Sequence, residues 1–124
     1  MKTTKLDELF SEFIRKRAMS RVHGCERCLA GKIDYKQLQC AHLTGRWRKS
    51  TRWDEDNAIG ACGGCHRVLD RDHIEKEEFI KEHLGEEGYN LLKARARTPA
   101  RYLDENALTL YYKEKIRLLE GAGE

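Results

Sequence analysis

Four of the five cysteines in this 124-residue chain form two identical pairs, Cys25-x-x-Cys28 and Cys62-x-x-Cys65. Two such pairs supply the four thiolates that a tetrahedral zinc ion requires. Because four thiolates leave no coordination position for water, we expect a structural zinc that performs no chemistry itself. A disulfide and unpaired thiols are the alternatives, and an environment that keeps thiols reduced favours the metal.

Three polar residues lie within or beside the segment between the two pairs: His42, Asn57 and His66. Taken singly, they have ordinary explanations as a histidine beside a strand, a turn or capping asparagine, and a neighbour of the zinc site. A zinc ion that holds both ends of the segment would also hold these side chains near one another. Histidine is a general base with a pKa near neutrality, and a divalent cation neutralises charge on a phosphate. The set therefore points to metal-dependent phosphodiester hydrolysis.

Basic and aromatic residues are interleaved between His42 and Asn57. A solvated turn is the alternative, but such turns seldom carry tryptophan, and this segment has two. We expect Trp53 in the core and Trp47 at the surface against a sugar or an unstacked base, with neighbouring cations on phosphates. The residues expected to contact DNA are Arg46, Trp47, Arg48, Lys49 and Arg52.

The composition is that of one charged domain. Hydrophobic residues make up 40% of the chain and charged residues 36%, so the core is modest and a metal staple is expected. The net charge of +3 is too small to establish a nucleic-acid partner by itself. The sequence shows no apolar run that could span a bilayer and no signal-peptide pattern, so we expect a cytoplasmic protein without a membrane partner. The sequence leaves the oligomeric state open.

The expected secondary structure is mostly helical. Thr3 or Thr4 caps a helix over about 5–18, whose apolar residues recur at helical spacing. Extended chain is expected over 33–43, and a long loop over 44–56. The other expected helices begin at His66, run over about 74–84 and 89–97, and follow a cap at Asp104.

The cysteine pairs together with His42 and the motif Asn57-x-x-x-x-Cys62-x-x-Cys65-His66 resemble the HNH endonucleases. More narrowly, most of the chain is similar, at looser spacing, to the lambdoid-phage NinG (Rap) recombination proteins. The segments that carry the second likeness are Cys40–Leu43, Arg52–Asn57 and a tail that includes Phe79, Gly85–Leu92, Tyr102–Leu108 and Tyr112-Lys113.

These resemblances imply a single α+β domain over 1–124. Its zinc-stapled ββα-metal (HNH) core would span about 22–73, after an N-terminal helix and before a helical extension at about 74–120. In this family pattern His42 would take a proton from water, Asn57 would fix the hairpin loop that holds this histidine, and His66 would bind a catalytic Mg²⁺ or Mn²⁺ ion. The implied function is a DNA endonuclease that acts in phage recombination on branched or nicked DNA, inside a bacterial host cell.

Ala41 departs from the HNH pattern, because many HNH enzymes place aspartate or histidine at this position as a second metal ligand. Asp70 lies one helical turn beyond His66 on the same face and could supply that ligand, as could Asp72 or His73. Without such a ligand, a non-catalytic zinc-stabilised DNA-binding module is the first alternative function.

Cys40 precedes His42 by two residues, so on a strand the two side chains share a face. It is either a further thiolate near the metal or a small buried side chain, and we favour burial. A zinc-scaffolded protein-interaction module is the remaining alternative function.

Overall fold

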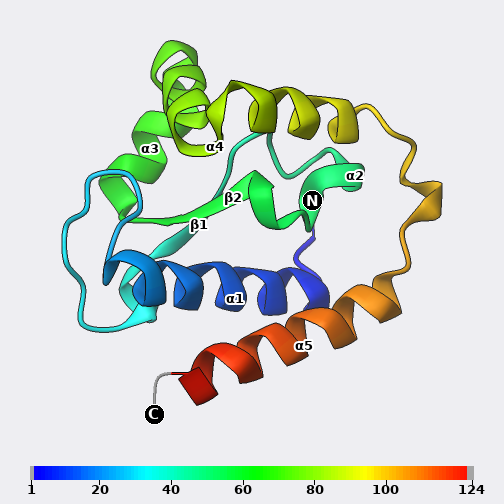
Figure 1. The fold of residues 1–124 in the computed structure, drawn as a ribbon, viewed down its shortest axis with the longest axis horizontal. Coiled ribbons are helices and arrows are strands. Elements are labelled where there is room, and N and C mark those ends of the chain that lie inside the picture. The colour runs from blue at the N-terminus through cyan, green and yellow to red at the C-terminus, as the bar shows by residue number, and fades with distance from the viewer. Residues whose placement is uncertain (1, 123–124) are drawn as a thin grey trace.

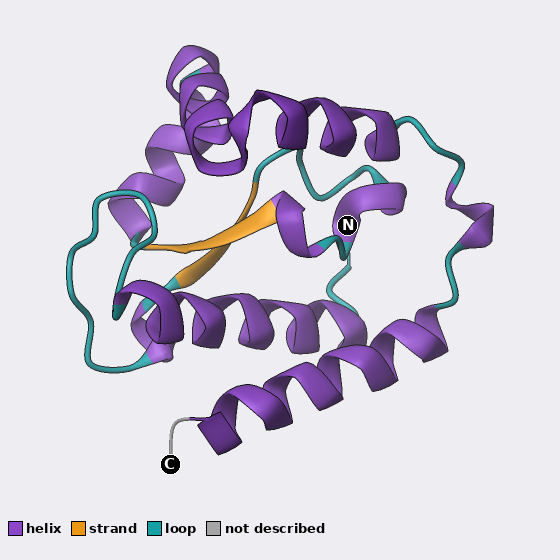
Figure 2. Cartoon of the chain, viewed as in Figure 1, coloured by secondary structure: helices purple, strands orange, loops and turns teal. Residues whose placement is uncertain are grey.

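The structure, a computed structural model, describes residues 2–122. Two short strands form an antiparallel hairpin, and helices pack on both sides of it (Figures 1 and 2). The expected small α+β architecture is confirmed. The elements are α1 (Lys5–Val22), η1 (Tyr35–Gln37), β1 (Gln39–His42), α2 (Lys49–Arg52), η2 (Glu55–Asn57), β2 (Ala58–Ala61), α3 (Gly63–Arg71), α4 (His73–Ala96), η3 (Ala100–Tyr102) and α5 (Glu105–Ala122).

The hairpin separates two layers of helices. His42 pairs with Ala58 at one end of the hairpin, and α1 packs against both strands. α5 lies along α1, whereas α3 and α4 lie on the other side of the hairpin (Figure 1). The approach of α1 is close, because a Cβ atom at Gly60 would lie only 2.6 Å from the Cβ of Ala18. Glycine in β2 therefore permits the contact between helix and hairpin.

Two apolar clusters fill the layers. The cluster between α1, α5 and the hairpin includes Phe10, Phe13, Ile14, Trp53, Tyr112 and Ile116. The cluster between the hairpin, α3 and α4 includes Cys25, Ala41, Ile59, Cys65, Leu69 and Ile80. Two of the paired cysteines thus belong to a core, so a metal at this point would stabilise a small cluster of apolar side chains.

The N-terminal helix begins where the sequence predicts. The side chain of Thr4 accepts a hydrogen bond from Asp7 N (3.1 Å), and the Asp7 carboxylate accepts one from Thr4 N (2.8 Å). This reciprocal pair is a capping box, which satisfies the amides of the first turn. The helix continues to Val22, beyond the expected end, and stops at His23 in the left-handed region (φ 56°).

The centre of the chain is more structured than expected. Within 33–43 only Gln39–His42 forms a strand, because Tyr35–Gln37 makes a helical turn capped by the side chain of Asp34. The expected loop over 44–56 contains the short α2. Turns of this kind are local hydrogen-bonded structures that alternating hydrophobicity does not reveal.

The two helices expected at 74–84 and 89–97 are parts of α4, which is broken at Gly85. Gly85 has φ 77° and ψ 163°, a backbone conformation that is essentially restricted to glycine. The last helix, α5, follows the expected cap, since Asp104 accepts a hydrogen bond from Ala107 N (3.1 Å). Within residues 2–122, no helix combines the length and the apolar character that crossing a bilayer demands.

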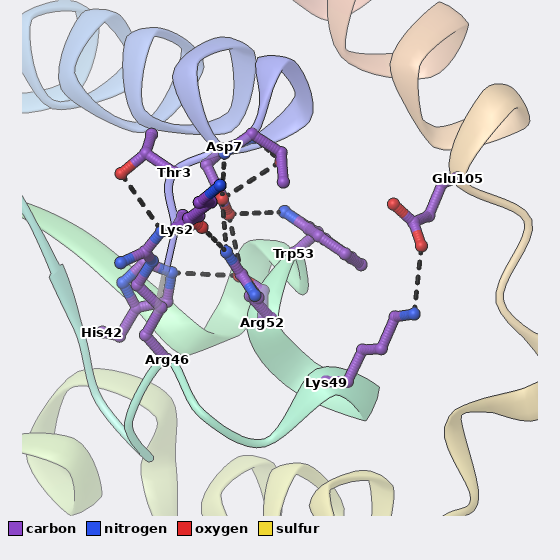
Figure 3. A network of polar contacts seen from close by, with 10 residues as sticks. Lys2, Thr3, Asp7, His42, Arg46, Lys49, Arg52, Trp53 and Glu105 are labelled. Atoms are coloured by element: carbon purple, nitrogen blue, oxygen red, sulfur yellow. Dashed lines mark hydrogen bonds and ion pairs between the residues drawn. The ribbon is translucent and has the colours of Figure 1, made fainter.

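Asp7 ties α1 to the loop that joins the strands (Figure 3). Its buried carboxylate accepts hydrogen bonds from Arg52 (2.8 Å), Arg46 (3.0 Å) and the indole Nε1 of Trp53 (2.9 Å). Burial raises the pKa of Asp7, but the hydrogen bonds, led by that from Arg52, outweigh burial and hold the pKa well below its usual value. The carboxylate is therefore ionised and acts as a structural counter-charge.

Replacing Asp7 with alanine should destabilise the protein by about 3 kcal/mol, because Arg52 would be left buried without a counter-charge. The folded-state pKa of Asp7 lies below its unfolded value of about 3.9. Its contribution is therefore complete above that value and is lost as the pH falls toward the folded pKa. Urea denaturation at several pH values measures both effects. Glu8→Ala removes the same charge from the exposed neighbour and should cost less than about 0.5 kcal/mol; equal losses would contradict this role for Asp7.

Candidate functional site

The cysteines of the two pairs converge at one point beside the hairpin. The sulfur atoms of Cys25, Cys28, Cys62 and Cys65 all lie within 4.8 Å of one another, and the Cys28 and Cys62 sulfurs are 3.9 Å apart. Zinc–sulfur bonds of about 2.3 Å separate the sulfurs of a tetrahedral site by about 3.8 Å. All four side chains are free thiols, so the size and chemistry of this cluster fit a structural zinc ion. The expected convergence is confirmed.

The first pair lies in a tight turn. Cys25 N donates to Ala30 O (3.1 Å), and Leu29 N donates to Cys25 O (2.9 Å), with Leu29 in the left-handed region at φ 64°. Gly24 is required here, because a Cβ atom would lie 2.1 Å from Ala30 O. The backbone alone therefore curls this segment so that Cys25 and Cys28 face the same point.

The second pair begins α3. The Cys62 side chain accepts a hydrogen bond from Cys65 N (3.5 Å), which caps the helix and lowers the pKa of the Cys62 thiol. Burial raises the pKa of Cys65, although Arg27 Nη1 lies 3.4 Å from its sulfur and opposes that rise. A zinc ion bound by four thiolates would carry a net negative charge, which the nearby Arg27 would partly offset.

Glu26, inside the first pair, connects the cysteine cluster to the hairpin. Glu26 N donates to Gly60 O (2.9 Å), and Gly60 N donates to the Glu26 carboxylate (3.1 Å). Because Gly60 belongs to β2, a metal in the cluster would hold the first turn and the start of α3 against the same strand.

His42 ends β1 and faces α1, with its ring 5.6 Å from that of Phe10. Its Nε2 lies 3.0 Å from the carbonyl oxygen of Arg52, which can only accept, so Nε2 carries the proton. Burial lowers the pKa of His42, which favours the neutral ring. His42 Nδ1 makes no hydrogen bond with the described residues. Among those residues, Arg17 Nε is the one buried side-chain N or O atom without a partner. His42 Nδ1 is therefore not buried and reaches solvent.

His42 lines a groove of about 430 Å³ between α1 and the hairpin. Arg15 and Arg46 line this groove, together with Asp7 and Cys40. A neutral imidazole with a free Nδ1 beside two guanidinium groups can accept a proton next to a bound anion.

Asn57 is completely buried and cross-links the loop between the strands. Its Oδ1 accepts hydrogen bonds from Thr44 N and Thr44 Oγ1, both at 2.7 Å, and its Nδ2 donates to Thr51 O (2.8 Å). Its main-chain oxygen accepts from Leu43 N (2.7 Å). Since Leu43 follows His42 directly and Arg52 follows Thr51, these bonds hold both the histidine and the carbonyl that orients its ring.

His66 lies in the first turn of α3 and contacts the opposite end of β1. Its Nδ1 is 2.7 Å from Gln39 Oε1, and its Nε2 is 3.5 Å from a carboxylate oxygen of Asp70. The expected proximity of His66 and Asp70 is confirmed. Gln39 and His42 are three residues apart on a strand, so their side chains leave opposite faces. The structure therefore brings His42 and Asn57 to one loop but does not bring His66 into contact with either.

The other candidates for the missing ligand lie elsewhere. Asp72 caps α4 by accepting hydrogen bonds from the first amides of that helix, and His73 is exposed at its start. Ala41 is buried against α3. Within residues 2–122, the four-cysteine cluster is the one group of three or more side chains placed to hold a metal ion.

Cys40 lies on the face of β1 opposite the four-cysteine cluster, next to the α1–α5 core. Burial raises the pKa of this thiol to about 12, so it stays protonated. The expectation of burial is confirmed in part, because Cys40 is partly buried against this core, and it is not a fifth thiolate at the cysteine cluster.

Two of the arginines expected to contact DNA are turned toward the protein (Figure 3). The Arg52 side chain is 11% exposed and donates to Asp7 and to Lys2 O (3.1 Å). Arg46 also donates to Asp7 and to Lys2 O (3.2 Å), but a third of its side chain remains exposed. Arg52 therefore supports the fold and offers no surface for DNA, which corrects the expectation for this residue.

The other three residues of that set remain at the surface. Lys49 forms an ion pair with Glu105 of α5 (3.1 Å) (Figure 3). Trp47 is 66% exposed, and the Arg48 guanidinium lies 4.5 Å from the centre of its ring. Trp53, in contrast, is 4% exposed, so its expected place in the core is confirmed.

No protein-family model, curated protein or solved structure matches the chain in the comparisons with known proteins. The resemblance to the HNH endonucleases consequently rests on the residues and on the geometry described above.

Asp7 and Thr51 are important to this site and were not expected from the sequence. The sequence does indicate a local role for Asp7, because Thr4 and Asp7 have the spacing of a capping box. That spacing does not reveal the hydrogen bonds of Asp7 with Arg46 and Arg52. Thr51 contributes a main-chain oxygen to Asn57, and main-chain contacts leave no trace in residue type.

Proposed function

We propose that the chain is a divalent-metal-dependent DNA endonuclease of the HNH type, with His42 as its general base. The observation that carries the proposal is the state of His42, whose Nε2–H is held by Arg52 O and whose side chain lines a groove together with Arg15 and Arg46. The order strand, strand, helix in β1, β2 and α3 supports the ββα-metal interpretation. Four cysteines that could hold a structural zinc support it as well.

In this mechanism, a water molecule in the His42 groove attacks the phosphorus of a DNA phosphodiester. His42 Nδ1 accepts the proton of that water as the new P–O bond forms and the bond to the leaving oxygen breaks. Asn57 positions the loop, and therefore the base, through Thr44 and Thr51. The exposed part of Arg46 lies beside the groove and attracts the phosphate.

A divalent ion would neutralise charge on the phosphate and on the leaving oxygen. His66 and Asp70 could contribute to binding such an ion, because Gln39 accepts from Nδ1 and leaves Nε2 free beside the Asp70 carboxylate, but they lie at the opposite end of β1 from His42. Two protein donors are too few for a resident ion, and imidazole is a poor ligand for Mg²⁺. The donor set therefore does not fit a complete site, and we assign His42 its role independently of the ion.

The resemblance to phage recombination proteins supports branched or nicked DNA as the substrate. A protein with that role would act in the bacterial cytoplasm. Both points are part of the proposal and rest on the resemblance rather than on the geometry of the site.

A non-catalytic DNA-binding module is the second candidate function. The specific observation in its favour is the separation of His66 from His42, at opposite ends and on opposite faces of β1. Such a protein would keep the zinc cluster and the basic surface but would leave phosphodiester bonds intact.

One experiment separates these functions. Purified protein is incubated with supercoiled plasmid and with labelled nicked and four-way-junction DNA, in Mg²⁺, in Mn²⁺ and in EDTA. We expect cleavage in one or both metals and none in EDTA. Binding to the same DNA without cleavage in any metal would favour the second candidate, and the absence of both binding and cleavage would overturn the two of them.

A further inference from the structure

Four basic residues line one groove between α4 and the loop that follows β1. Arg48 comes from the loop, Lys76 from the first part of α4, Lys93 from its second part, and Arg97 from its C-terminal cap. The groove has a volume of about 330 Å³. These four cations define what we call the α4 groove. Thr44, two residues after His42, also lines it, so the groove adjoins the proposed catalytic loop.

The break at Gly85 assembles the α4 groove. A continuous helix rises by about 1.5 Å per residue, which would place Lys76 and Arg97 roughly 30 Å apart. The backbone of Gly85, with φ 77°, interrupts the helix and turns its second part toward α2 (Figure 1). Both parts of α4 then contribute cations to one groove, beside a loop from a distant part of the sequence.

The cations of the α4 groove lack acidic partners. Within the part of the chain that the structure describes, none of the four forms an ion pair, whereas Arg46, Lys49 and Arg95 all do. The acidic residue that lines the groove, Glu77, is engaged with Lys81 (3.3 Å). Uncompensated like charges repel one another, and clustered basic residues of this kind are typical of a surface that binds a polyanion.

Two aromatic rings accompany these cations. The Lys93 ammonium lies 4.4 Å from the centre of the Tyr89 ring, and Arg48 lies over the exposed ring of Trp47. Flat rings beside cations suit a sugar–phosphate chain that carries bases, because the cations meet phosphates while the rings can stack on a base or a sugar. A small anion would use only part of this arrangement, because the cations come from three separate segments.

We propose that the α4 groove binds the sugar–phosphate backbone of DNA, and that it is the principal electrostatic contact of the protein with its substrate. This inference rests on the proposed function and adds where the DNA lies. The backbone follows the inner side of the broken helix α4, past Thr44, and passes the loop that holds His42. Because phosphates carry no sequence information, this contact holds DNA without selecting a sequence.

The test is a triple substitution, Lys76→Gln, Lys93→Gln and Arg97→Gln, with DNA affinity measured by fluorescence anisotropy over a series of salt concentrations. Each lost phosphate contact lowers the slope of log affinity against log salt by about 0.9. The triple variant should therefore flatten the slope by about 2.7 and weaken binding by on the order of 10²-fold near 0.1 M salt. Arg48→Gln alone should flatten the slope by about 0.9.

A matched control removes the same charge elsewhere, at three exposed lysines that form no ion pair with the residues that the structure describes: Lys5, Lys36 and Lys113, each changed to glutamine. The control should keep a steeper slope than the groove variant; equal slopes would overturn the proposal, because net charge alone would then explain the loss.

If the groove variant binds DNA as tightly as the wild-type protein and with the same slope, this inference is overturned but the proposed nuclease function is not. Absence of wild-type DNA binding would overturn both. Zinc content and circular dichroism show that each variant is folded, and the single Arg48→Gln variant provides the same test if the triple variant is not.

Discussion

Replacing His42 with alanine should lower the rate of DNA cleavage by roughly 10²- to 10⁴-fold, the usual contribution of a general base. The α4 groove and the cysteine cluster lie away from this side chain, so DNA affinity and zinc content should be unchanged. Single-turnover cleavage of labelled DNA, beside anisotropy and metal analysis, measures the three quantities separately. A catalytic role predicts a loss in the rate of cleavage alone.

The pH dependence of cleavage gives a second measure of His42. Burial lowers the pKa of its ring, so the neutral form required of a base persists below the ordinary histidine pKa of about 6.5. The rate of the wild-type protein should therefore be constant near neutral pH and should fall tenfold per pH unit only below the lowered pKa. In His42→Ala this acid limb should disappear from the residual activity.

The control for this variant is His23→Asn, which replaces an exposed histidine at the end of α1 with a residue that tolerates the left-handed conformation. It should cleave DNA at the wild-type rate. His42→Ala leaves Arg52 O without its donor, at a cost of about 1–3 kcal/mol, so its unfolding curve must show that the variant is native at the assay temperature. Wild-type cleavage by folded His42→Ala would remove this histidine from the mechanism.

Replacing Cys25 with serine should abolish zinc binding and unfold the hairpin core. Cys25 is fully buried among core side chains, and the apparent binding energy of a structural zinc is roughly 10–16 kcal/mol, which is available to folding only when the ligands are complete. Metal analysis should find about one zinc ion per wild-type chain and none in the variant. Circular dichroism and urea denaturation should show that the variant has lost its cooperative transition.

Cys40→Ala is the matched control, since this cysteine lies on the opposite face of β1 and outside the cluster. It should retain its zinc ion and its cooperative unfolding. A folded wild-type protein without zinc would contradict the metal assignment, and a zinc-loaded Cys25→Ser variant would exclude Cys25 from the ligands. If Cys40→Ala also loses zinc, the effect reflects general destabilisation rather than ligation.

The sequence by itself determined the features that depend on neighbouring residues. The sulfurs of each Cys-x-x-Cys pair are brought together locally, by a tight turn in the first pair and by the first turn of α3 in the second, so the expected cluster required only that the two pairs meet. The start of α1 follows from Thr4 and Asp7, three residues apart, and the cap at Asp104 is equally local. The resemblance implied that Asn57 fixes the loop, and its three side-chain hydrogen bonds, two with Thr44 and one with Thr51, all lie within that loop.

Only the tertiary structure decided the directions of the side chains and the partners of the charges. A strand of four residues is too short for alternating hydrophobicity to show which face His42 takes, and the opposite placement of His66 follows from the helix that packs on the other side. Arg46 and Arg52 look identical to Arg48 in the sequence, but α1 brings the buried Asp7 to the first two and leaves the third in the α4 groove. Ion pairs between distant segments depend on packing rather than on spacing, and therefore the sequence identified the basic residues but not which of them form ion pairs.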